Sequence, residues 1–212
     1  MEIEGIHIER LNHASFKIKK DKVIYVDPFK INDNEKADII LITHEHFDHF
    51  SIEDIKKVLD NKTVLVATSD CLSSLNKFDN QMKIVGPGSR LEVNGLSIEA
   101  TPAYNINKFR APRIPFHPKE DGKVGYIIEM NRKRIYISGD TDIIPEMQNI
   151  KNIDIMTIPV SGTYVMTAEE AAKAVEIIKP KIAIPCHYGA VVGSIEDAKK
   201  FKELAKTRVE II

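Results

Sequence analysis

The chain has few of the features that would place a protein outside the cell or in a membrane. Its 212 residues include two cysteines, Cys71 and Cys186, which lie far apart and form no C-x-x-C pair. A disulfide framework is therefore not expected, and such cysteine usage is typical of a reducing cytoplasm. Residues 1–5 lack the basic and apolar regions of a signal peptide. No apolar run approaches the roughly 20 residues that span a bilayer, so we expect a cytoplasmic protein without a membrane segment.

An excess of charge of either sign is also absent. The formal net charge is −1, with 30 Lys and Arg against 31 Asp and Glu. Without a basic field, binding of nucleic acid is not expected as the main task. Hydrophobic residues make up 43% of the chain and charged residues 29%, as in ordinary globular proteins. We expect one domain over residues 1–212, with apolar strands near both termini that permit a homo-oligomer without requiring one.

Periodicity predicts a chain rich in strands. Alternating or buried apolar runs predict strands at 6–11, 14–19, 22–26, 37–42, 63–67, 124–130, 134–138, 153–158, 181–185 and 208–212, and a hairpin at 91–98. Helix signals lie at 51–59, near 69, at 167–179 and at 194–206. Strand-rich segments followed by strand–helix–strand units occur before and after about residue 90, which suggests an internal structural duplication. Three prolines between residues 103 and 122 predict a long loop without regular structure.

One short segment is dense in metal-type donors. Thr43-His44-Glu45-His46-Phe47-Asp48-His49 follows the predicted buried strand 37–42. Three imidazoles and a carboxylate supply the nitrogen and oxygen ligands that Zn²⁺ prefers. His44 and His46 are two residues apart, so extended backbone points them to the same side. Asp48 and His49 require a tight turn, and one loop could thus serve two ions; the alternative is a surface loop that happens to be rich in histidine.

Two further strands end in a metal-type residue. Asp140 follows the predicted strand 134–138 after Gly139, and His187 follows the strand 181–185. Taken alone, Asp140 could be a turn residue and His187 a hydrogen-bonded core histidine. Because sites in sheet proteins gather at the carboxyl ends of strands, three such strand ends in one chain predict a shared site.

The pattern His-x-His-x-Asp-His after a buried strand resembles the signature of the metallo-β-lactamase fold superfamily. His46 stands where the flavodiiron relatives carry Glu, so the resemblance is to the hydrolases. It implies an α+β fold, a four-layer αββα sandwich of two mixed β-sheets flanked by helices, with the metals at one edge. Among small single-domain members, the likeness is greatest to the lactonase-like hydrolases.

The resemblance also implies roles for these residues. His44 and His46 match ligands of a first ion, Asp48, His49 and His187 match ligands of a second, and Asp140 matches the bridging carboxylate. Two Zn²⁺ ions are expected, with Mn²⁺, Fe²⁺ or Ni²⁺ as alternatives. Asp48 and Asp140 are the expected catalytic carboxylates, because they can orient the nucleophile or carry its proton.

The chain departs from the family pattern at Asn105, where the superfamily usually supplies a third histidine to the first ion. An amide oxygen is a poor ligand for Zn²⁺. Three alternatives remain open: Asn105 contributes weakly, His117 reaches the site from the loop, or the first site lacks a ligand.

Two residues near the N-terminus are expected to support the ligands. His13 and Asp27 resemble superfamily positions behind the metal histidines, and a carboxylate there would accept a hydrogen bond from a ligand imidazole and fix its tautomer. The alternatives are a strand-end histidine and a turn residue without such roles.

The loop 103–122 is basic, and it is expected either to close over a substrate or to be a solvated face. As a lid it would offer Lys108, Arg110 and Arg113 to a phosphate or carboxylate. Tyr164, after the strand ending near residue 159, is an expected substrate contact.

The function expected from the sequence is metal-dependent hydrolysis. A metal-bound hydroxide would attack a small anionic ester, lactone or phosphodiester. A nuclease or RNA-processing enzyme is one alternative, and a non-catalytic member that binds metal or ligand, suggested by Asn105, is another.

Overall fold

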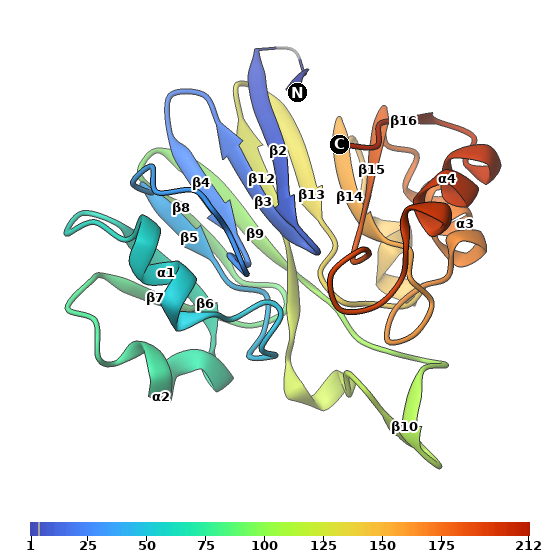
Figure 1. Ribbon diagram of the computed structural model, residues 1–212, viewed down its shortest axis with the longest axis horizontal. Coiled ribbons are helices and arrows are strands. Elements are labelled where there is room, and N and C mark those ends of the chain that lie inside the picture. The colour runs from blue at the N-terminus through green and yellow to red at the C-terminus, as the bar shows by residue number, and fades with distance from the viewer. Residues whose placement is uncertain (4) are drawn as a thin grey trace.

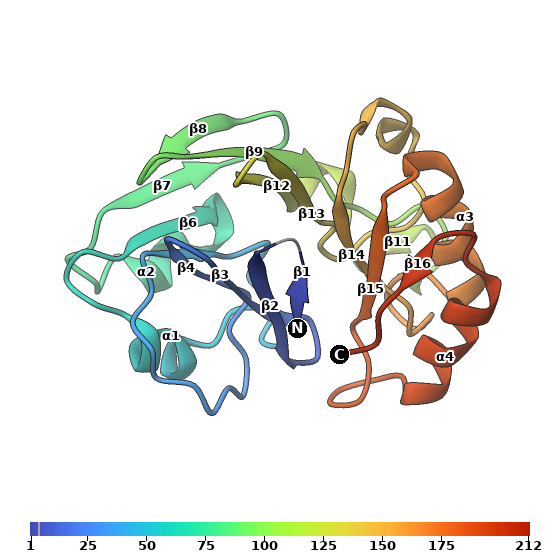
Figure 2. The same cartoon turned by 90° about the horizontal axis from the view of Figure 1, so that it is seen from above.

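Two seven-stranded sheets packed face to face form the centre of the molecule (Figures 1 and 2). This computed structural model describes residues 1–3 and 5–212. The first sheet contains, in spatial order, β1 (Glu2–Ile3), β2 (Ile6–Asn12), β3 (Ser15–Lys19), β4 (Val23–Val26), β5 (Ile39–Leu41), β6 (Val64–Thr68) and β7 (Met82–Val85). The second contains β16 (Arg208–Val209), β15 (Ile182–Cys186), β14 (Ile155–Pro159), β13 (Lys133–Ile137), β12 (Val124–Met130), β9 (Leu96–Pro102) and β8 (Arg90–Val93).

Both sheets are mixed, and they are built alike. In the first, β1 to β4 pair antiparallel and β4 to β7 pair parallel. In the second, β8, β9, β12 and β13 pair antiparallel, whereas β13 to β16 pair parallel. The parallel strands β5, β14 and β15 are buried on both faces, which explains why they read as largely apolar runs in the sequence.

Helices cover the outer face of each sheet. The helices α1 (Ile52–Val58) and α2 (Leu72–Leu75) lie on the first sheet, and α3 (Ala168–Ile178) and α4 (Ile195–Leu204) lie on the second (Figure 2). Short 3₁₀ turns, η1 (Ser69–Cys71), η2 (Lys119–Asp121) and η3 (Pro145–Asn149), occur between these elements. The start of α3 is fixed by a reciprocal pair of hydrogen bonds between Thr167 and Glu170. In the described part of the chain, no helix combines the length and the apolar character needed to cross a membrane.

Three hydrophobic cores separate the four layers. The central core lies between the sheets and joins residues such as Ile24 and Leu41 to Ile128 and Ile184. One outer core packs α1 and α2 on the first sheet, and the other packs α3, α4 and η3 on the second. Alternate residues of one strand enter different cores, as Ile39 and Ile40 do. The predicted αββα sandwich of two mixed sheets is therefore confirmed.

Differences from the sequence prediction are local. The strand β7 and the turn η3 were not predicted, because their apolar residues are too few for a clear period. The expectation of no regular structure between residues 103 and 122 was wrong, since β10 (Phe109–Ala111) and β11 (Ile114–Pro115) pair as a short hairpin. Proline is tolerated there because the hairpin is an isolated two-stranded edge. β10 projects away from the body of the sandwich (Figure 1).

The second sheet contains a position at which a larger side chain should destabilise the fold. Gly125 lies in β12, where a Cβ atom would stand 2.5 Å from the carbonyl oxygen of Ile137 and 2.6 Å from that of Ser138. Gly125→Ala should therefore force the backbone apart and destabilise the fold by about 1–3 kcal/mol, which lowers the melting temperature by about 3–10 °C.

Gly86→Ala is the matched control, because no heavy atom lies within 4 Å of its added Cβ. Thermal unfolding followed by circular dichroism should show a change of no more than about 2 °C for this variant. Equal melting temperatures for Gly125→Ala and the parent chain would contradict the close approach of β12 and β13.

Candidate metal centre

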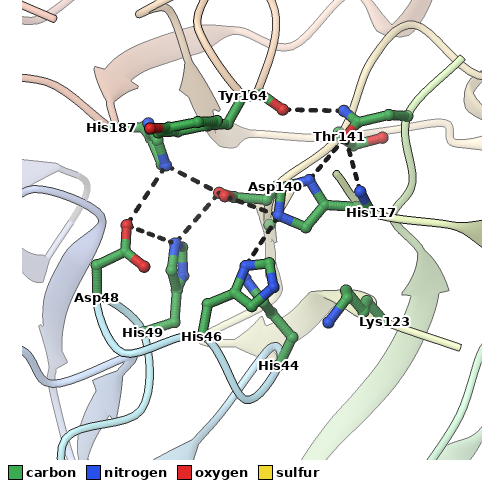
Figure 3. A network of polar contacts seen from close by, with 12 residues as sticks. His44, His46, Asp48, His49, His117, Lys123, Asp140, Thr141, Tyr164 and His187 are labelled. Carbon is green, nitrogen blue, oxygen red and sulfur yellow. Dashed lines mark hydrogen bonds and ion pairs between the residues drawn. The ribbon is translucent and has the colours of Figure 1, made fainter. Parts of the chain in front are cut away.

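Six predicted metal ligands converge at one edge of the sandwich. The loop after β5 carries His44, His46, Asp48 and His49, the segment after β13 carries Asp140, and the residue after β15 is His187. All except His46 are less than one-tenth exposed. Figure 3 shows their side chains pointing toward a common centre, with Asp140 between the histidines. The carboxyl ends of parallel strands thus deliver the donors, as the sequence predicted.

Gly139 sets the direction of Asp140. Its φ of +65° is a left-handed conformation, and a Cβ atom there would stand 2.6 Å from the carbonyl oxygen of Val124. Only glycine satisfies both conditions without strain. The chain therefore turns sharply after β13 and aims the carboxylate of Asp140 inward.

The carboxylate of Asp140 faces three imidazoles. Its Oδ1 lies 3.3 Å from Nε2 of His49, and its Oδ2 lies 3.1 Å from Nε2 of His187 and 3.4 Å from Nε2 of His117. Both oxygens are thus within reach of donors from both sides of the site. This is the position expected of a carboxylate that bridges two ions, although the bridging role itself stays a prediction.

The donors form three groups, in each of which the ligand atoms lie within 4.8 Å of one another, and two of the groups share His44. The groups are His44, His46 and His117; His44, His49 and Asp140; and His13, Asp48 and His187. The first and third lie on opposite sides of the middle one, so the arrangement offers two neighbouring positions for cations.

His117, and not Asn105, joins the first group. Nε2 of His117 lies 3.2 Å from Nδ1 of His46, and its Nδ1 lies 2.8 Å from Oδ1 of Asn105. Because an amide oxygen only accepts, Nδ1 of His117 carries the proton and Nε2 keeps its lone pair. Asn105 also donates to the carbonyl of Tyr164 at 3.0 Å, which fixes its orientation. Among the three alternatives, the geometry favours the one in which His117 reaches the site from the loop and Asn105 holds its ring.

Asp27 and Thr43 orient two more imidazoles from behind. Oδ2 of Asp27 lies 2.8 Å from Nδ1 of His49 and accepts the hydroxyl of Thr43 at 2.6 Å. Since the only hydroxyl proton of Thr43 goes to Asp27, its oxygen accepts from Nδ1 of His44 at 2.9 Å. His44 therefore presents an unprotonated Nε2 to the centre, and His49 does so when its ring is neutral, as it is when it binds a metal. Asp27 thus lies behind His49, and its expected role in support of a metal ligand stays a prediction; sequence reasoning missed Thr43.

His13 lies among the metal-type donors and not behind a ligand imidazole, where the sequence analysis expected it. Its Nε2 is 3.4 Å from Oδ2 of Asp48, and its ring centroid is 4.1 Å from that of His187. Its carbonyl accepts the backbone N–H of His187 at 2.9 Å. Ser161, which sequence reasoning also missed, contacts Nδ1 of His187 at 3.0 Å. His13 is therefore placed among the donors of the third group, not behind them.

Unpartnered nitrogens show that this donor set fits a metal ion. Nε2 of His13, His44, His49 and His187 is buried without a hydrogen-bond partner among the described residues. A buried polar atom left unpaired costs about 1–3 kcal/mol, and four such atoms aimed at one centre mark a place for a cation. Nitrogen and carboxylate oxygen donors suit Zn²⁺ and similar divalent ions.

The electrostatics agree with this fit. Burial lowers the pKa of His44 well below its ordinary value and that of His117 to about 4, so both are neutral imidazoles, the form that binds metals. Burial would raise the pKa of Asp140, but His187 and His49 outweigh it and hold that pKa well below the ordinary value. Burial likewise lowers the pKa of His49, but Asp140 and Asp27 outweigh it and raise that pKa. The carboxylates thus draw positive charge to the centre.

Backbone strain is concentrated at the same place. His13, Asp27 and His187 adopt φ values of 34°, 45° and 59°. A non-glycine residue in the left-handed region costs about 1–3 kcal/mol and persists where the surroundings enforce it, often at functional sites. The strand ends are therefore held in the conformation that aims these side chains.

The cations of the loop 103–122 lie apart from the donors. Nζ of Lys108 contacts Glu170 at 2.7 Å and Asp142 at 3.5 Å, so this ammonium is engaged within the protein. Arg110 and Arg113 are exposed on the β10–β11 hairpin. None of the three lines the cavity over the centre, whereas Tyr164 does.

A buried lysine that the sequence did not reveal supports the metal loop. Lys123 is 2% exposed, and its Nζ lies 2.5 Å from Oε2 of Glu45, between His44 and His46. The next residue, Val124, donates its backbone N–H to the carbonyl of Thr43 at 3.2 Å. These contacts tie the loop after β5 to β12 of the opposite sheet. Figure 3 shows Lys123 beside this loop.

Asn105 provides a test of the first group. Replacing it by alanine should free the ring of His117 and weaken binding of one ion about 10–100-fold, as loss of an orienting partner does. The affinity for the other ion should stay within threefold. Competition titration with a chromophoric chelator measures both. Asn107→Ala is the matched control, because Asn107 is exposed and bonds Glu170. Equal effects of the two substitutions would show that Asn105 does not orient a ligand.

Comparison with known proteins agrees with the fold and the donor set. The family model described as "Beta-lactamase superfamily domain" matches residues 7–187. A UPF0173 metal-dependent hydrolase of Thermoplasma acidophilum is 35% identical, with 97% of this chain and 93% of the relative covered. One of Thermococcus onnurineus is 31% identical, covering 98% of this chain and 95% of the relative.

Solved structures give the same result. A metal-dependent hydrolase of Parabacteroides distasonis has a TM-score of 0.84 at 35% identity and covers 97% of this chain and 92% of its own. Igni18, a metallo hydrolase of Ignicoccus hospitalis, shares the fold with a TM-score of 0.77 at 22% identity, covering 98% of this chain and 94% of its own. These findings confirm the resemblance to small hydrolases of the metallo-β-lactamase fold. The chain therefore belongs to the beta-lactamase superfamily, among the UPF0173 metal-dependent hydrolases.

Proposed function

We propose that this hydrolase uses two metal ions to cleave a small ester, lactone or phosphodiester. The observation that carries the proposal is the set of buried Nε2 atoms of His13, His44, His49 and His187, which lack a hydrogen-bond partner among the described residues and gather with the carboxylates of Asp48 and Asp140. Beside them lies a cavity of about 310 Å³, to which four other donors, His46, Asp48, His117 and Asp140, present their side chains. An open cavity over the donors is typical of a catalytic and not a structural metal site.

The donor groups suggest how the ions would be held. His44, His46 and His117 would bind the first ion. Asp48, His49 and His187 would bind the second, with His13 as an additional donor, and Asp140 would contact both. Zn²⁺ suits this set best, and Mn²⁺, Fe²⁺ or Ni²⁺ are alternatives.

When bound, such ions supply Lewis acidity and lower the pKa of water to about 7, which provides a nucleophile at neutral pH. The chain's own residues would do the rest. Asp48 and Asp140 line the cavity and are placed to accept and pass on a proton. Tyr164 lines the opposite side, where its ring would position the substrate. Asn105 and Asp27 keep the imidazoles of His117 and His49 in one tautomer.

The two alternative functions have less support. A non-catalytic role was suggested by Asn105, but His117 stands in the place of the third histidine. A nuclease would need cations beside the metals, as phosphate contacts dominate nucleic-acid binding. The groove lined by Arg132, Lys133, Arg134, Lys151, Lys179 and Lys181 lies instead at the amino ends of β13, β14 and β15, the edge opposite the donors.

Metal content provides one test of the proposed function. Protein purified without chelators, or reconstituted with Zn²⁺, should hold about two ions per chain by elemental analysis. His117→Ala should retain about one ion, because it removes a donor of the first group alone. His187→Ala and His13→Ala should also retain about one, through loss of the second. Failure to bind any of Zn²⁺, Mn²⁺, Fe²⁺ or Ni²⁺ would contradict the proposal.

Hydrolysis of model substrates provides another test of the proposed function. The loaded protein should hydrolyse at least one member of a panel of p-nitrophenyl esters, lactones and bis(p-nitrophenyl) phosphate. Dialysis against a chelator should remove the activity, and added metal should restore it. Asp48→Asn should lower kcat about 10²–10⁴-fold, the range of general acid–base catalysis, and elemental analysis will show whether the ions remain. Full metal occupancy without turnover on any class would favour the non-catalytic alternative.

A further inference from the structure

We propose that the substrate is a neutral ester or lactone with an apolar acyl chain, and that Phe47, Phe116, Tyr164 and Val191 hold that chain. This inference rests on the proposed function, and it names the substrate class of the same cavity. It departs from the small anionic substrate that the basic loop suggested in the sequence.

The lining of the cavity divides into two parts. Four of its eight residues, His46, Asp48, His117 and Asp140, belong to the metal-type donors. The other four are three aromatic residues and a valine: Phe47, Phe116, Tyr164 and Val191. None of the described residues that line the cavity is lysine or arginine. A reacting group can therefore sit on the donors, while whatever is attached to it meets an apolar wall.

The aromatic wall is already ordered. The rings of Phe116 and Tyr164 pack edge to face, with centroids 4.8 Å apart. Phe47 stands between two donors, is 67% exposed and touches Phe29 edge-on at 5.9 Å. A large apolar side chain so exposed beside a site is typical of a surface that a ligand covers. An acyl chain would bury the free face of Phe47 and rest against Val191.

Cations that could serve an anionic substrate are engaged elsewhere. Lys108 pairs with Glu170, Lys119 with Glu146 at 2.8 Å, and Lys123 with Glu45. Metal ions would compensate charge at the reacting group alone. A second phosphate or carboxylate farther out would lose water against aromatic rings without a partner, which is costly. The cavity thus disfavours sugar phosphates and similar anions.

The volume limits the chain length. At about 30 Å³ for a water-sized group, the 310 Å³ cavity holds about ten such groups. About four of these are taken by the reacting ester, which leaves room for about six carbons. Each buried methylene should raise kcat/KM about fourfold, which corresponds to about 0.8 kcal/mol.

The kinetic test compares p-nitrophenyl acetate, butyrate, hexanoate and decanoate with an ester that carries a terminal carboxylate and with bis(p-nitrophenyl) phosphate. The metal-loaded chain should show kcat/KM rising to hexanoate and no longer rising at decanoate. The carboxylate ester should fall at least tenfold below the neutral ester of equal length. The same preference should hold for lactones with short and long alkyl substituents.

A matched pair of variants locates the effect. Val191→Ser should reduce the ratio of the hexanoate to the acetate kcat/KM about fivefold, because Val191 lines the cavity. Val192→Ser should keep the parent ratio, because Val192 is similarly half-buried but does not line it. Neither valine is one of the metal-type donors. Elemental analysis checks that both variants keep their metal.

A binding readout separates this inference from catalysis. The chain has no tryptophan, so Phe47→Trp introduces a single tryptophan in the cavity wall, whose emission can be followed apart from that of the tyrosines. Hexanoate should shift its emission to shorter wavelength and bind at least tenfold more tightly than acetate, while inorganic phosphate should leave the emission wavelength unchanged. Phe109→Trp, on the exposed β10, should respond to neither.

The outcomes distinguish the two proposals. Turnover that is independent of chain length, or that favours the carboxylate ester or the phosphodiester, would overturn the apolar substrate and leave the hydrolase standing. Chain-length-dependent binding of hexanoate to Phe47→Trp without turnover of any ester or lactone would support the apolar cavity and count against the proposed reaction. If neither turnover nor chain-length-dependent binding of hexanoate is observed, both proposals are overturned.

Discussion

A carboxylate buried in a protein loses its hydration and is stable only beside hydrogen-bond donors or cations. Asp140 is 4% exposed, and its two oxygens face Nε2 atoms of His49, His117 and His187. These residues come from β13, from the loop after β5, from the loop beyond β11 and from the end of β15. The need to surround one carboxylate therefore requires both sheets to end at the same edge.

The sandwich meets this requirement with contacts between the sheets. Tyr126 of β12 donates its hydroxyl to the carbonyl of Ile42 at 2.7 Å, just before the metal loop. Lys123 and Val124 reach Glu45 and Thr43 across the same gap. Arg10 joins the other side, because its guanidinium donates to the carbonyls of His13 and Tyr188 at 3.3 Å. Rigid strands thus fix loops that have little regular structure of their own.

Local sequence was sufficient to predict a candidate metal ligand wherever a donor directly follows a strand. The segment from His44 to His49, together with Asp140 and His187, could be assigned because apolar runs mark the strands and strand ends meet at one edge. The αββα order followed from the resemblance, and the periodicity placed most of its strands and helices. His117 remained one of three alternatives, since its place depends on the hairpin β10–β11, which brings the chain back beside Asn105.

Charge was the property that sequence predicted least well. A run of cations between residues 103 and 122 suggested an anion site, but pairing decides whether a cation is available. The partners of Lys108 and Lys119, Glu170 and Glu146, lie 62 and 27 residues away in the chain. Such pairs arise from tertiary packing alone, so the composition of a loop does not tell which face of a cavity is charged.

The centre also bears on the stability of the fold. Buried Nε2 atoms without a hydrogen bond and three residues with positive φ oppose folding, and each of the three strained residues costs about 1–3 kcal/mol. The three hydrophobic cores supply the opposing stability. An ion that satisfies the nitrogens would remove part of the cost, because binding to the folded chain alone stabilises it. The strained strand ends are thus tolerated because the layers are well packed, and they keep the donors aimed at one point.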